Sequence, residues 1–332
     1  MAMPGKTNAL TDVAGISVGQ AEDVQVRTGV TVILPETRAV CAVDVRGGGP
    51  GTRETDALAA HTLVDAVDAV VLSGGSSYGL AAADGVAASL GAQGRGFALM
   101  DLPGVPRSPV VPSAILYDLA NDGDKAWGED PPYRRLGRDA LDAVGGTVAL
   151  GRAGAGFGAM AGAHPGGTGT ASLVTAAGFT IGALVCVNSF GSVTLPGAGD
   201  VYWAWPFEID GEFGGARPPA GWSMPPQDWG AAKYNPGARE NTTIAVIATD
   251  AALSPAQAKR LAIMAQDGLS RAIRPVHTPF DGDVVFALST AAQPLPQEGG
   301  ELALAELGAA AADTLARAVA RGVHAARRAS AG

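Results

Sequence analysis

The feature that most constrains this chain is the junction at residues 240–250, where a loop rich in proline and glycine meets a run of β-branched and apolar residues. Residues 242–249 read Thr-Thr-Ile-Ala-Val-Ile-Ala-Thr, which predicts a buried strand that begins at Thr242. Residues 254–257, Ser-Pro-Ala-Gln, then have the spacing of a capped helix start. The unit is therefore loop, strand and helix, with a hydroxyl group at the head of the strand.

This hydroxyl group becomes a possible nucleophile if the peptide bond before it breaks. Breakage of the bond between Asn241 and Thr242 would place a new α-amine beside the Oγ of the same residue. The unperturbed pKa of an α-amine is about 7.7–8.0, which suits proton abstraction near neutral pH. We therefore interpret Asn241–Thr242 as a bond that the chain cuts in itself.

Two other interpretations of this junction stay open. Threonine is common at strand starts because of its β-propensity alone. Residues 241–243 also match an N-glycosylation sequon, but that use requires secretion, which nothing in the chain supports.

Composition excludes several classes of protein. With 332 residues, 47% of them apolar, the chain can bury a continuous core. Only 5% of the residues are aromatic while 47 are glycine, so packing depends on small side chains and close backbone approaches. The net charge of −9 argues against a nucleic-acid partner. No apolar stretch reaches the length of a membrane span, and we expect a cytoplasmic protein with no membrane contact.

The rest of the chain alternates strand-like and helix-like patterns. The predicted strands are a three-stranded meander over residues 13–45 and single strands at 69–72, 179–187 and 284–288. Helices are predicted at residues 55–67, 133–144, 255–273 and 302–326. A further predicted helix begins after residue 79 and ends at residue 90. Residues 208–239 are a long irregular stretch, which is uncommon unless the loop is functional or mobile. Because this stretch lies just before Asn241, it can supply the slack, that is, the spare chain length, that lets the two chain ends separate after cleavage.

Two glycine-rich segments have competing interpretations. Residues 74–79 open a helix and can either hold an anion on free N–H groups or allow close packing of helix and strand. Residues 154–159 match the dinucleotide pattern G-x-G-x-x-A, but no acidic residue follows until Asp200 and no regular βαβ alternation surrounds them. We therefore reject a nucleotide-dependent oxidoreductase and expect these glycines to let the backbone approach a substrate.

Polar residues at strand ends are further candidates for a site. Asn188 ends an apolar strand, where it either points into a cleft or merely caps the strand. Asp281 and Asp283 flank Gly282 just before a strand. The four histidines lack ligand-pair spacing and the loop lacks further acids, so we expect no metal. The two carboxylates can orient an ammonium and a hydroxyl group, or belong to a solvated turn.

Together these residues resemble a known family. The motifs that carry the resemblance are Asn241-Thr242-Thr243-Ile244 with Asp281-Gly282-Asp283 downstream, Gly-Arg-Ala-Gly-Ala-Gly at 151–156, residues 166–172, Tyr117 in Ile115-Leu116-Tyr117-Asp118, and Asn188 after its strand. Over residues 10–326 the chain is similar to the P1 (DmpA-type) family of self-processing N-terminal-nucleophile peptidases. Within that family it most resembles the endo-type 6-aminohexanoate (nylon) oligomer hydrolases.

The resemblance implies a fold and a set of roles. The fold is a four-layer α/β/β/α sandwich of the α/β (α+β) class, a single domain over residues 1–332 that cuts itself into 1–241 and 242–332. The α and β fragments form a heterodimer, and four heterodimers form a homo-oligomer. Thr242 is the nucleophile, Asp281 and Asp283 orient it, and Asn188 and Tyr117 position the substrate and stabilise the oxyanion.

The implied activity is that of an amidase or aminopeptidase acting on amino-acid amides, small peptides or ω-amino-acid oligomers, with no cofactor. One residue departs from the family pattern. Where the family has a lysine just before the Gly-Gly-x-Gly run, this chain has Pro165 preceded by His164. Either another cation replaces the lysine, or the processing rate and substrate preference differ. The alternative function is a small-molecule binding or scaffold protein that kept the fold and lost processing.

Overall fold

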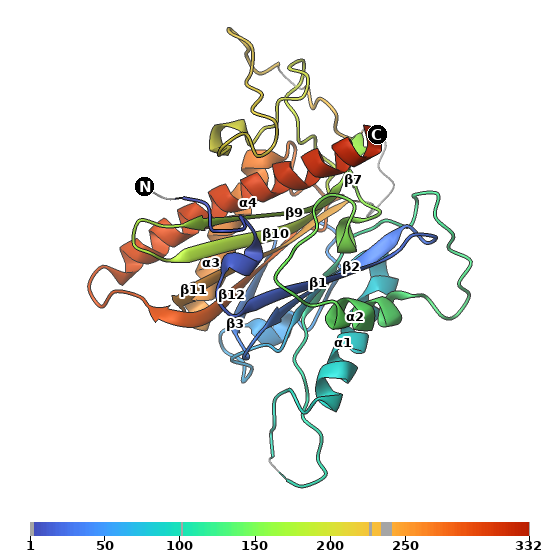
Figure 1. Ribbon diagram of the computed structural model, residues 1–332, viewed down its shortest axis with the longest axis vertical. Helices are drawn as coiled ribbons and strands as arrows, with labels where there is room; N and C mark the ends of the chain where they lie inside the picture. Colours follow the sequence, from blue (N-terminus) through green and yellow to red (C-terminus); the bar gives the residue numbers. More distant parts are fainter. Residues whose placement is uncertain (1–2, 101, 226–227, 234–240, 332) are drawn as a thin grey trace.

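Two five-stranded sheets lie face to face in the computed structural model, with a pair of helices on the outer side of each sheet (Figure 1). The structure describes residues 3–100, 102–225, 228–233 and 241–331. Three separate apolar cores fill the spaces between the four layers. The predicted α/β/β/α sandwich is therefore confirmed.

The first sheet, named the β11 sheet, has its longest buried strand in the centre. Its order is β3 (Val40–Val45), β12 (Val284–Pro294), β11 (Thr242–Ala252), β10 (Thr180–Asn188) and β9 (Gly167–Val174). Strand β11 runs antiparallel to β10 and parallel to β12. Ten of its eleven residues are buried, as its near-continuous apolar sequence predicts for a strand covered on both faces.

The second sheet, named the β2 sheet, is shorter and comes from the first third of the chain. Its order is β1 (Ile16–Asp23), β2 (Thr28–Pro35), β5 (Val70–Ser73), β6 (Ser113–Ile115) and β4 (Thr52–Arg53). A separate small hairpin joins β7 (Met160–Ala161) to β8 (His164–Pro165). The β2 sheet places the chain that follows β6, including Tyr117, opposite the β11 sheet.

Each sheet has its own helices. Helices α1 (Ala81–Ala92) and α2 (Tyr133–Asp142) cover the β2 sheet, and α3 (Pro255–Ala272) and α4 (Gly300–Ala331) cover the β11 sheet. Short 3₁₀ helices occupy Leu10–Asp12, Asp56–Leu58, Ser76–Leu80, Gly154–Gly156 and Trp205–Phe207. Helix α3 begins with the predicted capping box, in which the Ser254 side chain accepts from the Gln257 N–H group.

Two sequence-based predictions about the fold are wrong. The segment 55–67 is not a long helix, because it contains only a short 3₁₀ turn and its end is extended, where Ala39 and Val67 exchange two backbone hydrogen bonds. The third strand of the predicted meander, β3, leaves its neighbours and pairs with β12 in the β11 sheet. In both cases a long-range strand pairing overrides the local pattern.

The irregular stretch before β11 is anchored at its beginning. Glu212 accepts hydrogen bonds from the Arg317 guanidinium of α4, at 2.5 and 3.0 Å, and from the side chain of Asn8. Arg317 is only 2% exposed, so this ion pair is held away from solvent. The slack predicted for this stretch does not apply near residue 212, and residues 234–240, nearest the proposed cut, lie outside the described residues.

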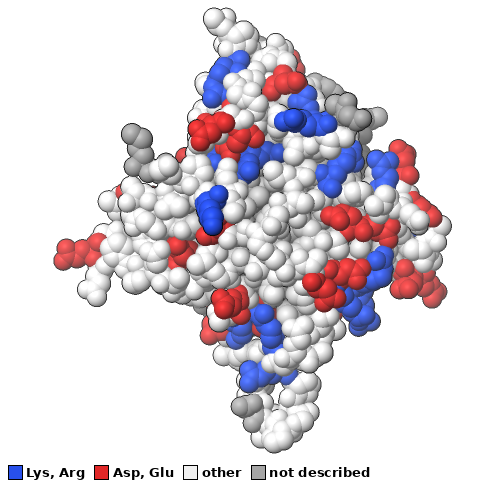
Figure 2. All heavy atoms as spheres, in the orientation of Figure 1, with Lys and Arg blue, Asp and Glu red and all other residues white. Residues whose placement is uncertain are grey.

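The surface carries charges of both signs. On the face drawn in Figure 2, acidic and basic side chains are interspersed over the elements. Within the described residues, none of the helices is both long and apolar enough to cross a membrane.

Candidate active site

The candidate nucleophile lies at the head of the central strand, as predicted. Strand β11 begins at Thr242, which pairs in register with Asn188, the last residue of β10. Thr242 is 3% exposed and Asn241 is completely buried. The antiparallel register therefore places an amide side chain directly across from the hydroxyl group.

The carbonyl group of Asn241 has two hydrogen-bond donors. The Thr242 hydroxyl group donates to the carbonyl oxygen from one side, and the Gly282 N–H group donates to it at 2.9 Å. A Cβ atom at position 282 would lie 2.8 Å from Thr242 Oγ1, so only glycine fits beside this hydroxyl group. The peptide bond before Thr242 is thus polarised, with the hydroxyl group next to it.

Asp281 and Asp283 hold the turn that delivers the Gly282 N–H group. Asp281 accepts from the Phe190 N–H group at 3.1 Å and from the Thr278 hydroxyl group at 2.6 Å. Asp283 accepts from the Thr243 N–H group at 2.7 Å. The carboxylates therefore contact the residues around the candidate nucleophile.

The two acids have different surroundings. Burial, reinforced by the neighbouring Asp283 carboxylate, raises the pKa of Asp281 to about 6. The other Asp283 oxygen lies 2.8 Å from His277 Nδ1 and also accepts from the His277 N–H group. The solvated-turn interpretation is wrong for these acids, which are each 1% exposed.

Asn188 connects the two sheets at the site. Its Nδ2 donates to the carbonyl oxygen of Tyr117 at 2.8 Å, and its Oδ1 accepts from the Met160 N–H group at 2.9 Å. Tyr117 follows β6 of the β2 sheet, so this amide joins the end of β10 to the opposite sheet. The structure brings Tyr117 and Asn188 to the lining of one cleft.

This cleft has a volume of about 130 Å³. Its lining residues are Tyr117, Asp118, Ala120, Asn121, Gly158, Met160, Asn188 and Lys233. Lys233 is the residue that sequence reasoning missed. Its Nζ donates to Asn241 Oδ1 at 2.8 Å, which places a cation beside the candidate scissile bond.

Pro165, where the family lysine was expected, lies in the β7–β8 hairpin opposite Met160. His164 beside it contacts the Thr194 hydroxyl group at 3.3 Å. Lys233 is one of only four lysines in the chain, and its position eight residues before Asn241 is a weak signal that could have drawn attention to it. The cation beside Asn241 thus comes from the irregular stretch.

The glycine-rich segments serve mainly for packing. The Gly75 N–H group donates to the Asp118 carboxylate, and a Cβ atom at Gly75 would collide with the Tyr133 ring, so the packing interpretation of residues 74–79 is supported. Gly154 and Gly156 likewise approach the side chain of Thr31 and the backbone of Thr168. Of the segment 151–162, Gly158 and Met160 line the cleft.

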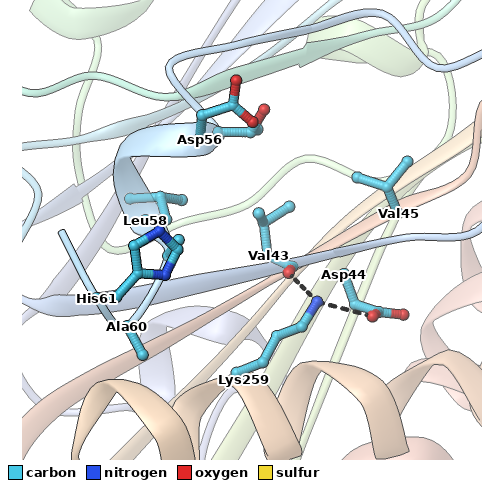
Figure 3. A pocket seen from close by; sticks show the side chains of 10 residues that line it. Val43, Asp44, Val45, Asp56, Leu58, Ala60, His61 and Lys259 are labelled. Carbon is cyan, nitrogen blue, oxygen red and sulfur yellow. Dashed lines mark hydrogen bonds and ion pairs between the residues drawn. The ribbon is translucent and has the colours of Figure 1, made fainter.

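A larger cavity, of about 630 Å³, lies elsewhere, beside the edge strand β3. Figure 3 shows the Lys259 amino group turned toward the Val43 carbonyl oxygen and the Asp44 carboxylate. The other residues that line this cavity include His61 and Asp56. Asn188, which pairs with Thr242, and Lys233, which contacts Asn241, line the smaller cleft, so cavity volume does not locate the candidate active site.

The sandwich with a hydroxyl residue at the head of its central strand defines the class of N-terminal-nucleophile hydrolase folds. A solved L-aminopeptidase/D-Ala-esterase/amidase from Ochrobactrum anthropi, described as a variant of that fold, superposes with a TM-score of 0.68 at 26% identity, covering 98% of this chain and 88% of that one. The sequence from residue 8 to residue 332 matches the model of peptidase family S58. The chain belongs to this family and is an amide-bond hydrolase.

Curated relatives agree with the family. An uncharacterized aminopeptidase of Mycobacterium tuberculosis is 46% identical, over 95% of this chain and 93% of the relative. A 6-aminohexanoate-oligomer endohydrolase of Kocuria sp. is 33% identical, over 89% of this chain and 79% of the relative. The predicted resemblance to this family of peptidases and nylon-oligomer hydrolases is therefore confirmed.

Proposed function

We propose that the chain cuts itself between Asn241 and Thr242, and that the freed Thr242 then hydrolyses amide bonds in amino-acid amides, small peptides or ω-amino-acid oligomers. The observation that supports this most directly is the carbonyl group of Asn241, which accepts from both the Thr242 hydroxyl group and the Gly282 N–H group. The Gly282 N–H group can stabilise the negative charge that develops on this oxygen under attack, and the Thr242 hydroxyl group beside it is the attacking group.

In the first phase, Thr242 Oγ1 attacks the carbonyl carbon of Asn241. The existing hydrogen bond lets the hydroxyl proton pass to the carbonyl oxygen as the new C–O bond forms, and the Gly282 N–H group stabilises the developing charge. Collapse of the tetrahedral intermediate breaks the C–N bond, and the proton moves to the leaving amine. Water then cleaves the resulting ester, which leaves a carboxylate on Asn241 and a free α-amine on Thr242.

In the second phase, the α-amine acts as the general base. It takes the proton from Oγ of its own residue, Oγ attacks the substrate amide, and the leaving amine receives the proton. Asn188 and Tyr117 position the substrate and contribute to the oxyanion site, which agrees with their place in the cleft. Asp283 orients the start of β11 by accepting from the Thr243 N–H group, and Asp281 fixes the turn that carries Gly282 by accepting from Phe190 and Thr278.

The two fragments should remain associated after the cut. Residues 242–332 contribute β11 and β12 to the interior of the β11 sheet and α3 and α4 to its outer side. Separation would expose the apolar core between these helices and the sheet, which is unfavourable at about 25 cal/mol per Å² of apolar surface. We also propose that four such heterodimers assemble into a tetramer in the cytoplasm.

Intact-mass measurement of the purified chain tests the first phase. We expect fragments 1–241 and 242–332 after incubation. A protein that stays full length, with no fragment starting at Thr242, would instead indicate the binding or scaffold alternative. A panel of amino-acid anilides and linear amide oligomers then tests the second phase and identifies the substrate.

A further inference from the structure

Lys233 contacts the acyl side of the bond that we propose is cut. Its Nζ donates to Oδ1 of Asn241 at 2.8 Å, while the Asn241 side chain is completely buried. The same lysine lines the cleft with Tyr117 and Asn188. The side chain of Asn241 therefore occupies a small site whose polar contact is an ammonium group.

The ester formed in self-cleavage is chemically the same species as the later acyl-enzyme. In both, an acyl carbonyl carbon is bonded to Oγ1 of Thr242, and water must reach that carbon. The acyl group in the first ester is residue 241, and the acyl group in the second comes from the substrate. Once the cut end withdraws, a substrate acyl group attached to the same oxygen meets the same surroundings.

We propose that Lys233 is a specificity-determining residue that selects substrates whose acyl residue carries a hydrogen-bond acceptor oxygen on its γ-carbon, as asparaginyl and aspartyl residues do. The inference rests on the proposed function of Thr242 and extends it to the substrate. A hydrogen bond between a charged donor and a neutral acceptor is worth about tenfold or more in affinity or rate. This hydrogen bond favours acyl groups that carry the acceptor oxygen over apolar acyl groups, which cannot form it.

The other charged group of the cleft does not compete for this role. The Asp118 carboxylate is occupied by the Thr28 hydroxyl group at 2.7 Å and by the Gly75 N–H group at 2.7 Å. On the side-chain amide of Asn241, Nδ2 has no hydrogen-bond partner among the described residues. Recognition of this side chain is thus concentrated on its acceptor oxygen, so a carboxylate should be accepted as well as an amide.

Self-cleavage rates of full-length variants give the first test. We expect Asn241→Asp to cut at a rate close to that of the parent chain. Asn241→Leu keeps the shape but lacks the acceptor oxygen, so its rate should fall to about one tenth of the parent rate or lower. Lys233→Met should slow the parent chain by a similar factor and should slow the Asn241→Leu chain no further. Lys259→Met, which removes a lysine from the edge of β3, is the matched control and should cut normally.

Substrate selectivity of the mature protein gives the second test. We expect N-acetyl-asparaginyl-p-nitroanilide to be hydrolysed with a kcat/KM about tenfold or more above that of the N-acetyl-leucyl analogue. This preference should persist in Lys259→Met and disappear in any Lys233→Met protein that matures.

Two results would overturn the inference while leaving the proposed function intact. One is a wild-type protein that cuts itself and hydrolyses both anilides equally well. The other is strictly additive slowing by Lys233→Met and Asn241→Leu, which would mean that Lys233 acts independently of the acyl side chain. If the wild-type chain never yields a fragment that starts at Thr242, the proposed function itself has failed, and the two failures are therefore distinguishable.

Discussion

Two deeply buried carboxyl groups with raised pKa values, Asp281 at the β11 sheet and Asp118 at the β2 sheet, differ in what surrounds them. Asp281 lies just before β12 in the β11 sheet, and Asp118 lies just after β6 in the β2 sheet. Burial is the main cause that raises the pKa of each to about 6. A raised pKa alone therefore does not distinguish a group at the reacting bond from a structural one.

The partners of the two acids make the distinction. Asp281 is followed by Gly282, whose N–H group contacts the Asn241 carbonyl oxygen. Asp118 instead binds Thr28 and Gly75, which fixes the turn after β5 to the start of β2. We infer that the acid of the β11 sheet serves the reaction and that the acid of the β2 sheet serves the fold.

The largest effect is expected at the head of β11. Thr242→Ala should stop self-cleavage and abolish amidase activity, because the attacking oxygen is absent, while the folded state persists because alanine fits a buried strand start. Intact mass and circular dichroism measure both outcomes. Thr243→Ala is the matched control, since its hydroxyl group has no partner among the described residues. A Thr242→Ala chain that still breaks at this bond would place the nucleophile elsewhere.

The next effect concerns Asp281 in the mature enzyme. Activity should rise with pH as the α-amine of Thr242 loses its proton, within about one unit of 7.7–8.0. Asp281 is ionised there, because its pKa of about 6 lies below this range, and its charge favours the ammonium form. Asp281→Asn should therefore move the rising limb of the kcat/KM profile to lower pH and slow the reaction.

His277 provides the control for this pH profile. Its Nδ1 lies 2.8 Å from Asp283 Oδ2, so we expect it to position that carboxylate and not to act as the base. The His277→Ala profile should keep its rising limb. If His277→Ala removes the pH dependence and Asp281→Asn leaves it in place, a Thr–His mechanism must replace the amine as base.

A smaller effect is expected at Pro165. Pro165→Lys adds a cation to the hairpin whose Met160 N–H group contacts Asn188, so maturation should be faster or its pH dependence altered. The change should be modest because Lys233 already lies beside Asn241. Pro165→Met is the uncharged control in a time course of fragment formation. If both variants aggregate, the fixed backbone of the proline is what this position needs.

The sequence predicted the reacting end of the β11 sheet better than the loop that faces it. Thr242 and the helix start at Ser254 could be predicted because strand propensity and capping are local properties. Strand β9 (Gly167–Val174) was not assigned, because its glycines and hydroxyl residues lack a strand-like apolar pattern. The contact of Lys233 with Asn241 could not be predicted, because it depends on the path of an irregular stretch that has no periodicity.

The comparison also predicts that Asp118→Asn leaves self-cleavage largely intact, because its partners belong to the β2 sheet. The amide can still accept from the Gly75 N–H group and can donate to the Thr28 hydroxyl group, so the turn should persist. A self-cleavage rate measured beside that of Asp281→Asn checks this difference. If Asp118→Asn stops cleavage, the assignment of one acid to the reaction and the other to the fold is wrong.

The smallest expected effect is on the pH dependence of stability, which tests the assignment of Asp118 to the fold. The pKa of Asp118 rises from 3.8 to about 6 on folding, so the folded state favours the protonated carboxyl group. Its contribution to stability is therefore fully present below pH 3.8 and is lost as pH rises through about 6. The difference corresponds to roughly 3 kcal/mol at most. Urea unfolding at pH 4.5 and pH 7 should show a smaller loss of stability with rising pH in Asp118→Asn than in the parent. An unchanged slope would mean that this carboxyl group ionises in the folded state much as it does in the unfolded chain, and its burial would then be without electrostatic consequence.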